Sequence, residues 1–190
     1  PTSGTSSIPA YTNLTNSTTS AITLTLQAQA ITSGQAQCPG APVNYTITVN
    51  PSPSVAANFV SNDTVCNSQN INISLSSTAA GTTFTWTATN GSGVTGGQNS
   101  AAPSATINQV LSNSSNNVGN VTYTITPSAS SCPGSPLQVI AYVNPVATVG
   151  PFSPITVCPG ATITAPTFVS NPTGSTFAWT NNNIQIGLVG

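Results

Sequence analysis

The sequence of 190 residues contains no Lys, no Arg and no His, and Asp63 is its one acidic residue. Globular domains carry about a quarter charged residues, so charged surface of either sign is almost missing. General acid–base catalysis needs a side chain that titrates near neutral pH. Ser–His–Asp and Cys–His arrangements need a histidine. We therefore expect the chain not to be an enzyme.

The same absences limit what the chain can bind. Nucleic-acid binding depends on Lys and Arg, a calcium site on several carboxylates, and a zinc site on histidines or four converging cysteines. No apolar run approaches the roughly 18 residues of a membrane span; VIAYV at 139–143 has the length of a strand. We expect no nucleic acid, no metal, no cofactor and no membrane span in this stretch.

Neutral polar residues replace the charged ones, with 57 Ser and Thr and 21 Asn. The 37% of apolar residues stand in short runs that alternate with polar residues, which is typical of half-buried strands. Segments rich in Gly, Ser and Asn at 89–100 and 112–117 read as loops. The alternating runs are 22–26, 70–76, 83–87, 121–125 and 137–143. Long stripes of helical period are missing, so we predict an all-β fold.

Four sequence anchors recur at nearly one spacing. Cys38 and Cys132 are 94 residues apart, and so are the two copies of Val-Asn-Pro. The two Thr-Val-Cys triplets are 92 residues apart, and GTTFTWT and GSTFAWT are 93 apart. A fixed period of this kind indicates repeated structural units. We therefore expect repeats of about 93 residues.

The anchors divide the chain into three parts. We call 1–51 the leading segment, 52–145 the central repeat and 146–190 the trailing segment; we interpret the first and last as the C-terminal half and the N-terminal half of neighbouring repeats. Each repeat has an early cysteine (Cys66, Cys158) and a late cysteine (Cys38, Cys132). Although Cys158 stands in a third Cys-Pro-Gly triplet, it aligns with Cys66.

Units of this size with short alternating strands predict immunoglobulin-like β-sandwiches, arranged in tandem as an extended rod. Trp86 and Trp179, together with Phe84 and Phe177, are the candidate core aromatic residues. The alternative for the tryptophans is a platform on which carbohydrate rings stack. Proline-bearing linkers at 49–54 and 143–154 stiffen the junctions between repeats.

A domain of this size has a small core, so a cross-link would contribute much to its stability. A disulfide between Cys66 and Cys132 would close a loop of roughly 66 residues and stabilise the fold by about 4 kcal/mol. Cys38 and Cys158 would then pair outside this stretch or with adjacent segments. Paired cysteines imply an oxidising, extracellular setting. The alternative is four free thiols.

Read together, TVC, GTTFTWT or GSTFAWTNNN, SGTSSIPAYTN, ITLTL, CPG and YTITVNP resemble the PKD-like, immunoglobulin-type repeats of Bacteroidota surface proteins. The resemblance implies a cell-surface β-sandwich in tandem arrays of very long adhesins. These include gliding-motility adhesins, which the type IX secretion system exports. Typical PKD domains carry an acidic-glycine motif after the strand tryptophan, and WTATNG and WTNNNI lack it. Calcium and catalytic roles are therefore not implied.

Reading Gly190 directly into Pro1 produces TNNNIQIGLVGPTSGTSSIPAYTN, which looks like an uninterrupted repeat. We interpret the chain as a two-domain period of a long array. The alternative is a separate subunit whose half-domains are completed by identical neighbouring chains in a fibre, as in donor-strand assembly.

Two kinds of glycosylation signal occur. Asp63-Thr64 followed by a small apolar residue resembles the O-glycosylation acceptor of Bacteroidota, which makes Thr64 a candidate site, although aspartate also caps turns by itself. Eight Asn-x-Ser/Thr sequons occur, a number close to chance for this composition. They are at Asn13, Asn16, Asn44, Asn62, Asn72, Asn90, Asn113 and Asn120.

From these observations we expect a structural repeat of an extracellular filament or adhesin stalk on a bacterial surface. Its partners would be neighbouring repeats of the same chain or identical chains, and glycans. The alternative from another class is a module that binds carbohydrate or protein through Tyr11 and Asn-rich loops such as 89–100.

Overall fold

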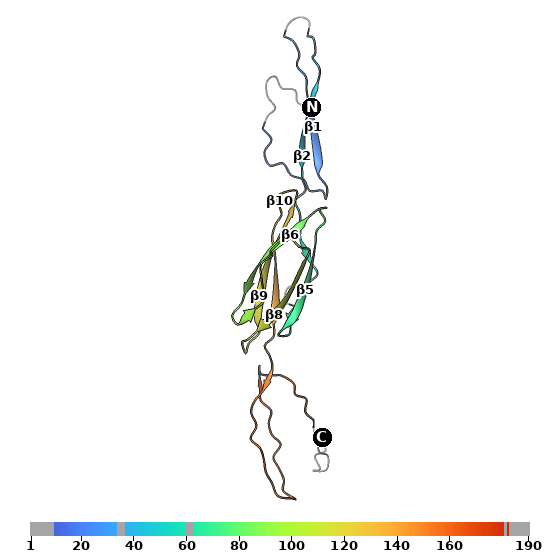
Figure 1. The fold of residues 1–190 in the computed structure, drawn as a ribbon. Helices are drawn as coiled ribbons and strands as arrows, with labels where there is room; N and C mark the ends of the chain where they lie inside the picture. Colours follow the sequence, from blue (N-terminus) through green and yellow to red (C-terminus); the bar gives the residue numbers. More distant parts are fainter. Residues whose placement is uncertain (1–9, 34–36, 60–62, 181, 183–190) are drawn as a thin grey trace.

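The computed structural model describes residues 10–33, 37–59, 63–180 and 182. Every regular element in these ranges is a β-strand, and the longest strands gather in the middle of an elongated molecule (Figure 1). The prediction of an all-β fold is therefore confirmed. Within the described ranges, no helix is long and apolar enough to cross a membrane.

The central repeat folds into two sheets. One sheet contains, in order, β3 (Ala56–Ala57), β5 (Gln69–Ser76), β8 (Thr106–Asn113) and β7 (Val94–Thr95). The other contains, in order, β10 (Cys132–Pro133), β9 (Gly119–Ala129), β11 (Leu137–Val143) and β4 (Thr64–Val65), and β6 (Thr83–Asn90) also pairs with β9. All these pairs are antiparallel except β4 with β11, which is parallel. β4 therefore lies at a sheet edge.

Alternation along the strands places their apolar side chains between the two sheets. In β5 the buried residues Ile71, Ile73 and Leu75 alternate with exposed polar ones. Full burial of one such side chain stabilises the fold by roughly 1.5–3 kcal/mol. The rest of the buried cluster is Phe84, Trp86, Val94, Ile107, Leu111, Val121, Tyr123, Ile125, Val139, Ala141 and Val143. The core therefore draws on both sheets of the central repeat.

Gln109 of β8 alternates with buried residues and so occupies the core side of its strand. Its Oε1 accepts hydrogen bonds from the Tyr123 hydroxyl at 2.8 Å and the Gln98 backbone N–H at 3.0 Å. The Gln98 carbonyl accepts from Gln109 Nε2 at 2.8 Å and from the Trp86 indole N–H at 3.0 Å. This network satisfies the polar atoms of both large aromatic residues, and burial raises the pKa of Tyr123.

The leading segment contributes a hairpin of β1 (Ile22–Ala28) and β2 (Val43–Val49), paired from Ile22–Val49 to Ala28–Val43. β9 and β11 pair in the same way, from Gly119–Val143 to Ile125–Leu137. Val49 and Val143 are the valines of the repeated Val-Asn-Pro, so β1 and β2 are the counterparts of β9 and β11.

The core face of this hairpin is not covered. Leu24 of β1 is 42% exposed, whereas its counterpart in β9, Val121, is fully buried. Ile22, Val43 and Tyr45 are exposed as well. Among the described residues, β1 and β2 form a two-stranded sheet on their own. The hairpin therefore has the strand register of β9 and β11, but among the described residues no second sheet covers its apolar face.

The two early cysteines begin the same turn. The Gln69 N–H donates to the Cys66 carbonyl at 3.2 Å, and the Ala161 N–H donates to the Cys158 carbonyl at 3.2 Å. The third residue of each turn has a positive φ, 60° at Ser68 and 82° at Gly160. The glycines of the other two Cys-Pro-Gly triplets are not among the positive-φ residues. This geometry agrees with aligning Cys158 with Cys66.

The trailing segment extends beyond the opposite end of the sandwich (Figure 1). Its strands β12 (Thr148–Val149) and β13 (Ser170–Asn171) pair over two residues. Phe168 contacts Phe152 edge-on and stacks on Phe177, with ring centroids 5.2 Å apart in each pair.

The expectation that Trp179 and Phe177 are core residues is wrong for this structure. They are 59% and 36% exposed, whereas Trp86 and Phe84 are 8% and 4% exposed in the core. The difference follows from strand pairing. β6, which carries Trp86 and Phe84, pairs with β9 along its whole length, and within the described residues nothing pairs in this way with 174–180.

Candidate functional site

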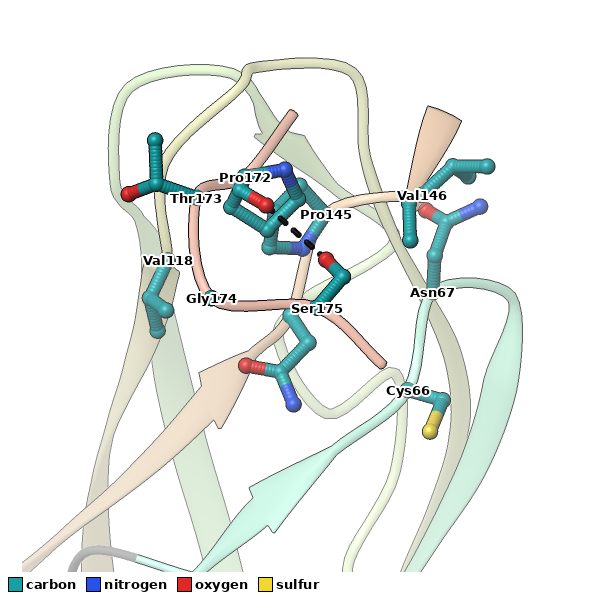
Figure 2. A pocket seen from close by; sticks show the side chains of 11 residues that line it. Cys66, Asn67, Val118, Pro145, Val146, Pro172, Thr173, Gly174 and Ser175 are labelled. Atoms are coloured by element: carbon teal, nitrogen blue, oxygen red, sulfur yellow. Dashed lines mark hydrogen bonds between the residues drawn. The ribbon is translucent and has the colours of Figure 1, made fainter. Parts of the chain in front are cut away.

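Each end of the sandwich has a cavity where the central repeat meets a neighbouring segment. The leading junction is a cavity of about 260 Å³ between residues 14–16, residues 50–52, Cys132 and Pro133. The trailing junction is a cavity of about 530 Å³ between Cys66, Asn67, Val118, residues 144–147 and residues 172–175 (Figure 2). Both are lined by one cysteine and by the Asn-Pro of a linker, so the two junctions are built alike.

The linker at the leading junction is docked on the sandwich. Pro51 and Pro53 are both buried. The Gly134 N–H donates to the Pro127 carbonyl at 2.9 Å, and a Cβ on Gly134 would overlap the carbonyl of Pro53. The glycine of this Cys-Pro-Gly triplet is therefore required by the close approach of the linker backbone. Pro145, the counterpart of Pro51, is buried in the same way.

One asparagine in each of two repeats anchors the loop that precedes β9 or its counterpart β1. Asn113 Nδ2 donates to the carbonyls of Val143 and Asn117, at 2.8 Å each, and its Oδ1 accepts from the Ser115 N–H at 2.9 Å and hydroxyl at 2.7 Å.

Asn16 makes the same four bonds in the leading segment. Its Nδ2 donates to Val49 at 2.7 Å and Ser20 at 2.8 Å, and its Oδ1 accepts from the Thr18 N–H at 2.9 Å and hydroxyl at 2.7 Å. Asn16 and Asn113 each tie a loop to the last residue of the final strand of their repeat. The similarity between the leading segment and the central repeat therefore includes the hydrogen bonds of this polar side chain.

These contacts give two of the Asn-x-Ser/Thr sequons a structural role. Asn113 is 3% exposed and both of its amide atoms are hydrogen-bonded, so it is not an acceptor for a glycan in the folded protein. The Ser or Thr at the third position is needed because its hydroxyl bonds the asparagine oxygen. The number of sequons in the sequence does not distinguish this structural role from chance occurrence.

Thr64 lies in the edge strand β4 and is exposed. The Tyr142 N–H donates to the carbonyl of Asp63 at 2.9 Å, which fixes the start of β4 against β11. The hydroxyl of Thr64 is therefore accessible on a rigid strand, and its glycosylation stays a prediction.

The expected disulfide between Cys66 and Cys132 is not formed in this structure. Cys66 follows β4 at the end of β11 marked by Val143, and Cys132 lies in β10, beyond the opposite end of β11. The seven residues of β11 separate these ends by roughly 20 Å at about 3.3 Å per residue, whereas a disulfide requires Cα atoms within about 7 Å. Strand order, which spacing does not reveal, overturns this pairing.

All four thiols are free: Cys38, Cys66 and Cys158 are exposed, and Cys132 is half-buried. Cys38 lies in the connection that follows β1 and precedes β2, where its N–H donates to the Thr32 hydroxyl at 2.9 Å. In the part of the chain that the structure describes, no three His, Cys, Asp or Glu side chains lie close enough together to hold a metal ion.

The segment 89–100, a candidate binding loop, is bonded to the sandwich instead of projecting from it. Its strand β7 pairs with β8. Asn99 Oδ1 accepts from the Ala88 N–H at 2.8 Å, and Ser100 Oγ accepts from the Trp86 N–H at 3.0 Å. These side chains are used to join the two sheets at the β6 edge. Tyr11, the other candidate, is 44% exposed.

Comparison with known proteins relates the middle of the chain to a known family. Residues 63–147 match the model of a family described as PKD-like domain. The matched range begins just before β4 and ends just after β11, so it coincides with the strands that enclose the core. No curated protein matches the chain. The centre of the chain is therefore a PKD-like β-sandwich.

Proposed function

We propose that this chain, with the PKD-like sandwich at residues 63–147 as its centre, is a structural repeat of an extracellular filament or adhesin stalk on a bacterial surface. PKD-like domains are immunoglobulin-like modules that are common in extracellular proteins. The observation that carries the proposal is the pair of incomplete, apolar segments at the two ends of the sandwich.

The two end segments complement each other. The leading hairpin supplies counterparts of β9 and β11 with their core face exposed. The trailing segment supplies the counterpart of β6, with Trp179 and Phe177 exposed. In the central repeat these elements pair, because Trp86 lies opposite Ile125 in the β6–β9 ladder. The trailing segment of one unit and the leading segment of the next therefore form one more sandwich.

End-to-end growth follows from the placement of these segments at opposite ends of the central sandwich (Figure 1). The buried prolines at each junction restrict the linker backbone, which favours a rod. Neighbouring repeats, in one chain or in identical chains, are the partners in this proposal. We assign no catalytic role, no cofactor and no nucleic-acid partner, because Lys, Arg and His are missing.

A surface with almost no charge suits an exposed fibre. No Lys or Arg is present for trypsin-like proteases to cleave after, and interactions between charges contribute little that salt could screen. Thr64 on its exposed edge strand is the candidate attachment point for glycans. The resemblance to gliding-type adhesins exported by type IX secretion extends the proposal to that class of surface protein.

The experiment compares a single copy of the chain with two copies joined from Gly190 to Pro1. We expect the tryptophan emission of the joined pair to shift to the blue, because Trp179 of the first copy becomes buried against the hairpin of the second. Leu24→Asp in the second copy should abolish the shift. The same change in the first copy should leave it intact, because that hairpin has no partner. A joined pair with the emission of two single chains would refute the proposal.

The mass of the natural denatured chain separates the two forms of assembly. A mass of hundreds of kilodaltons indicates a covalent array. A mass near the 18.9 kDa of this sequence indicates separate subunits that complete each other.

A further inference from the structure

We propose that disulfide bonds cross the junctions between repeats, each joining the early cysteine of one repeat to the late cysteine of the next. The inference rests on the proposed function, since it takes repeats to stack end to end. Early and late cysteines lie at opposite ends of the central sandwich, so stacking brings one of each to every junction. A single copy holds only one member of each pair, in agreement with its four free thiols.

At the trailing junction, Cys66 lines the same cavity as Gly174 and Ser175 (Figure 2). Gly174 is the counterpart of Gly81: both precede a Phe-x-Trp sequence, and their φ values are 86° and 70°. Cys66 therefore meets the turn that begins the β6 counterpart of the next repeat.

In the central repeat, the start of β6 lies close to the late cysteine. Thr83 of β6 pairs with Ser128 of β9, and Ser128 also pairs with Pro133, the neighbour of Cys132. Strands are about 4.8 Å apart, so β6 and β10 are separated by roughly 10 Å there. The same arrangement in the next repeat places its late cysteine at the rim of the cavity that Cys66 lines.

The leading junction gives the same result from the other side. Cys132 lines its cavity together with Asn16, which makes the same hydrogen bonds as Asn113. The Asn113 N–H donates to Asn67 Oδ1 at 2.5 Å, and Asn67 directly follows Cys66. The early cysteine of the preceding repeat therefore belongs beside Asn16, on the cavity that Cys132 lines.

The trailing and leading junctions, argued from different residues, therefore both place an early cysteine beside the late cysteine of the next repeat. The thiols are also accessible, because Cys66 is exposed at the rim of its cavity and Cys132 is half-buried. In each new bond the two thiols lose two protons and two electrons and form one S–S bond. The acceptor is the disulfide of a thiol–disulfide exchange reagent or oxidoreductase, which is reduced to two thiols. The extracellular setting favours this direction.

The bond would give each junction a second covalent connection. The main chain already crosses the junction through a docked Asn-Pro linker. The disulfide would cross it beside that linker, because the Asn144 N–H donates to the carbonyl of Val65, the residue before Cys66, at 2.9 Å. Two connections restrict the rotation of one repeat about the other. Cross-linking of repeats, and not of strands within a repeat, would therefore be the reason that the chain keeps two cysteines in each repeat.

The test uses two copies joined from Gly190 to Pro1, oxidised with a glutathione mixture and digested with pepsin under acidic conditions. Mass spectrometry should find peptides that link Cys66 to Cys38 and Cys158 to Cys132, with half of all thiols left free. Cys66→Ser in the first copy should release one further thiol, that of Cys38 in the second copy. Cys132→Ser in the first copy is the matched control and should leave both linked peptides in place.

Peptides that link Cys66 to Cys132 would overturn the inference, and so would thiols that all stay free. The tryptophan shift distinguishes this outcome from failure of the proposed function. If the shift occurs and no linked peptide forms, the repeats stack without the disulfide. If the shift is also missing, the stacking itself is wrong.

Discussion

The asparagines at the loop ends show how much a single polar side chain contributes to this uncharged protein. Asn113 is buried and bonds three backbone groups and one hydroxyl. In other proteins, pairs of opposite charge often tie a loop to a strand. Here one amide performs that task in both repeats, because it donates and accepts without the cost of burying a charge.

Asn113→Ala should destabilise the chain by about 2 kcal/mol, because it leaves the buried carbonyl of Val143 without this donor. Asn16→Ala, at the half-exposed counterpart, is the matched control and should cost clearly less, because water replaces the lost bonds. Urea unfolding followed by circular dichroism measures both. Equal losses would contradict the structural role assigned to Asn113.

Tyr123 should set the upper pH limit of stability. Burial raises its pKa above the usual value of about 10, so deprotonation is harder in the folded chain than in the unfolded chain. Its contribution is complete below about pH 10 and is lost as the pH rises beyond that value. The unfolding free energy should therefore decline above about pH 10.

The variant Tyr123→Phe should remove the part of this decline that Tyr123 causes, at a cost of about 1 kcal/mol for the hydrogen bond to Gln109. Tyr45→Phe, in the exposed hairpin, should leave the decline unchanged. An identical pH profile for the two variants would show that Tyr123 is not the group responsible.

Segments of similar sequence, 81–87 and 174–180, have different surroundings in this chain, and the two tryptophans report the difference. Trp86→Ala should cost about 3–5 kcal/mol, because it opens a cavity in the core. In a single copy, Trp179→Ala should change stability by less than about 0.5 kcal/mol, since Trp179 is 59% exposed. Thermal unfolding of both variants tests this contrast. A large loss for Trp179→Ala in the single copy would contradict the exposed position.

The turn between β10 and β11 depends on the linker that passes it. Gly134→Ala should destabilise the chain by about 1–3 kcal/mol, because the added methyl group overlaps the backbone at Pro53. Gly40→Ala is the matched control, since its Cβ would meet only the Ala30 carbonyl at an ordinary 3.5 Å. Comparable losses in chemical denaturation would show that linker docking is not the cause.

Alternation was sufficient to predict the strands that carry an unbroken apolar face, such as β5 and β11. The spacing of the two Val-Asn-Pro copies agrees with the equal register of β1–β2 and β9–β11. β8 was missed because the polar Gln109 occupies a core position between Ile107 and Leu111. The glycines of segment 89–100 predict a loop and conceal β7, which pairs with β8.

The site was predicted less well than the fold. The spacing of the cysteines groups them as early and late, but their pairing depends on which end of β11 each one reaches. That information is in the strand order, which places β4 beside β11 and β10 at the far end of β9. Neither composition nor spacing contains it.

The whole molecule is a sandwich with a segment beyond each end (Figure 1), and both segments expose large apolar side chains. Large exposed apolar faces are costly in water and usually mark interaction surfaces. In our proposal, the two faces belong to one sandwich that is divided between the end segments. We therefore expect single copies to associate end to end as their concentration rises, with an average mass in sedimentation that grows accordingly. Leu24→Asp should keep them monomeric. A concentration-independent monomer would contradict this account.

Amide hydrogen exchange in two copies joined from Gly190 to Pro1 tests the central claim most directly. The account predicts two equal populations for peptides that cover 22–28. One population exchanges as in the single copy, and the other, from the second copy, is as protected as 119–125 of the central sandwich. One unprotected population, identical to that of the single copy, would contradict the claim that the end segments complete each other.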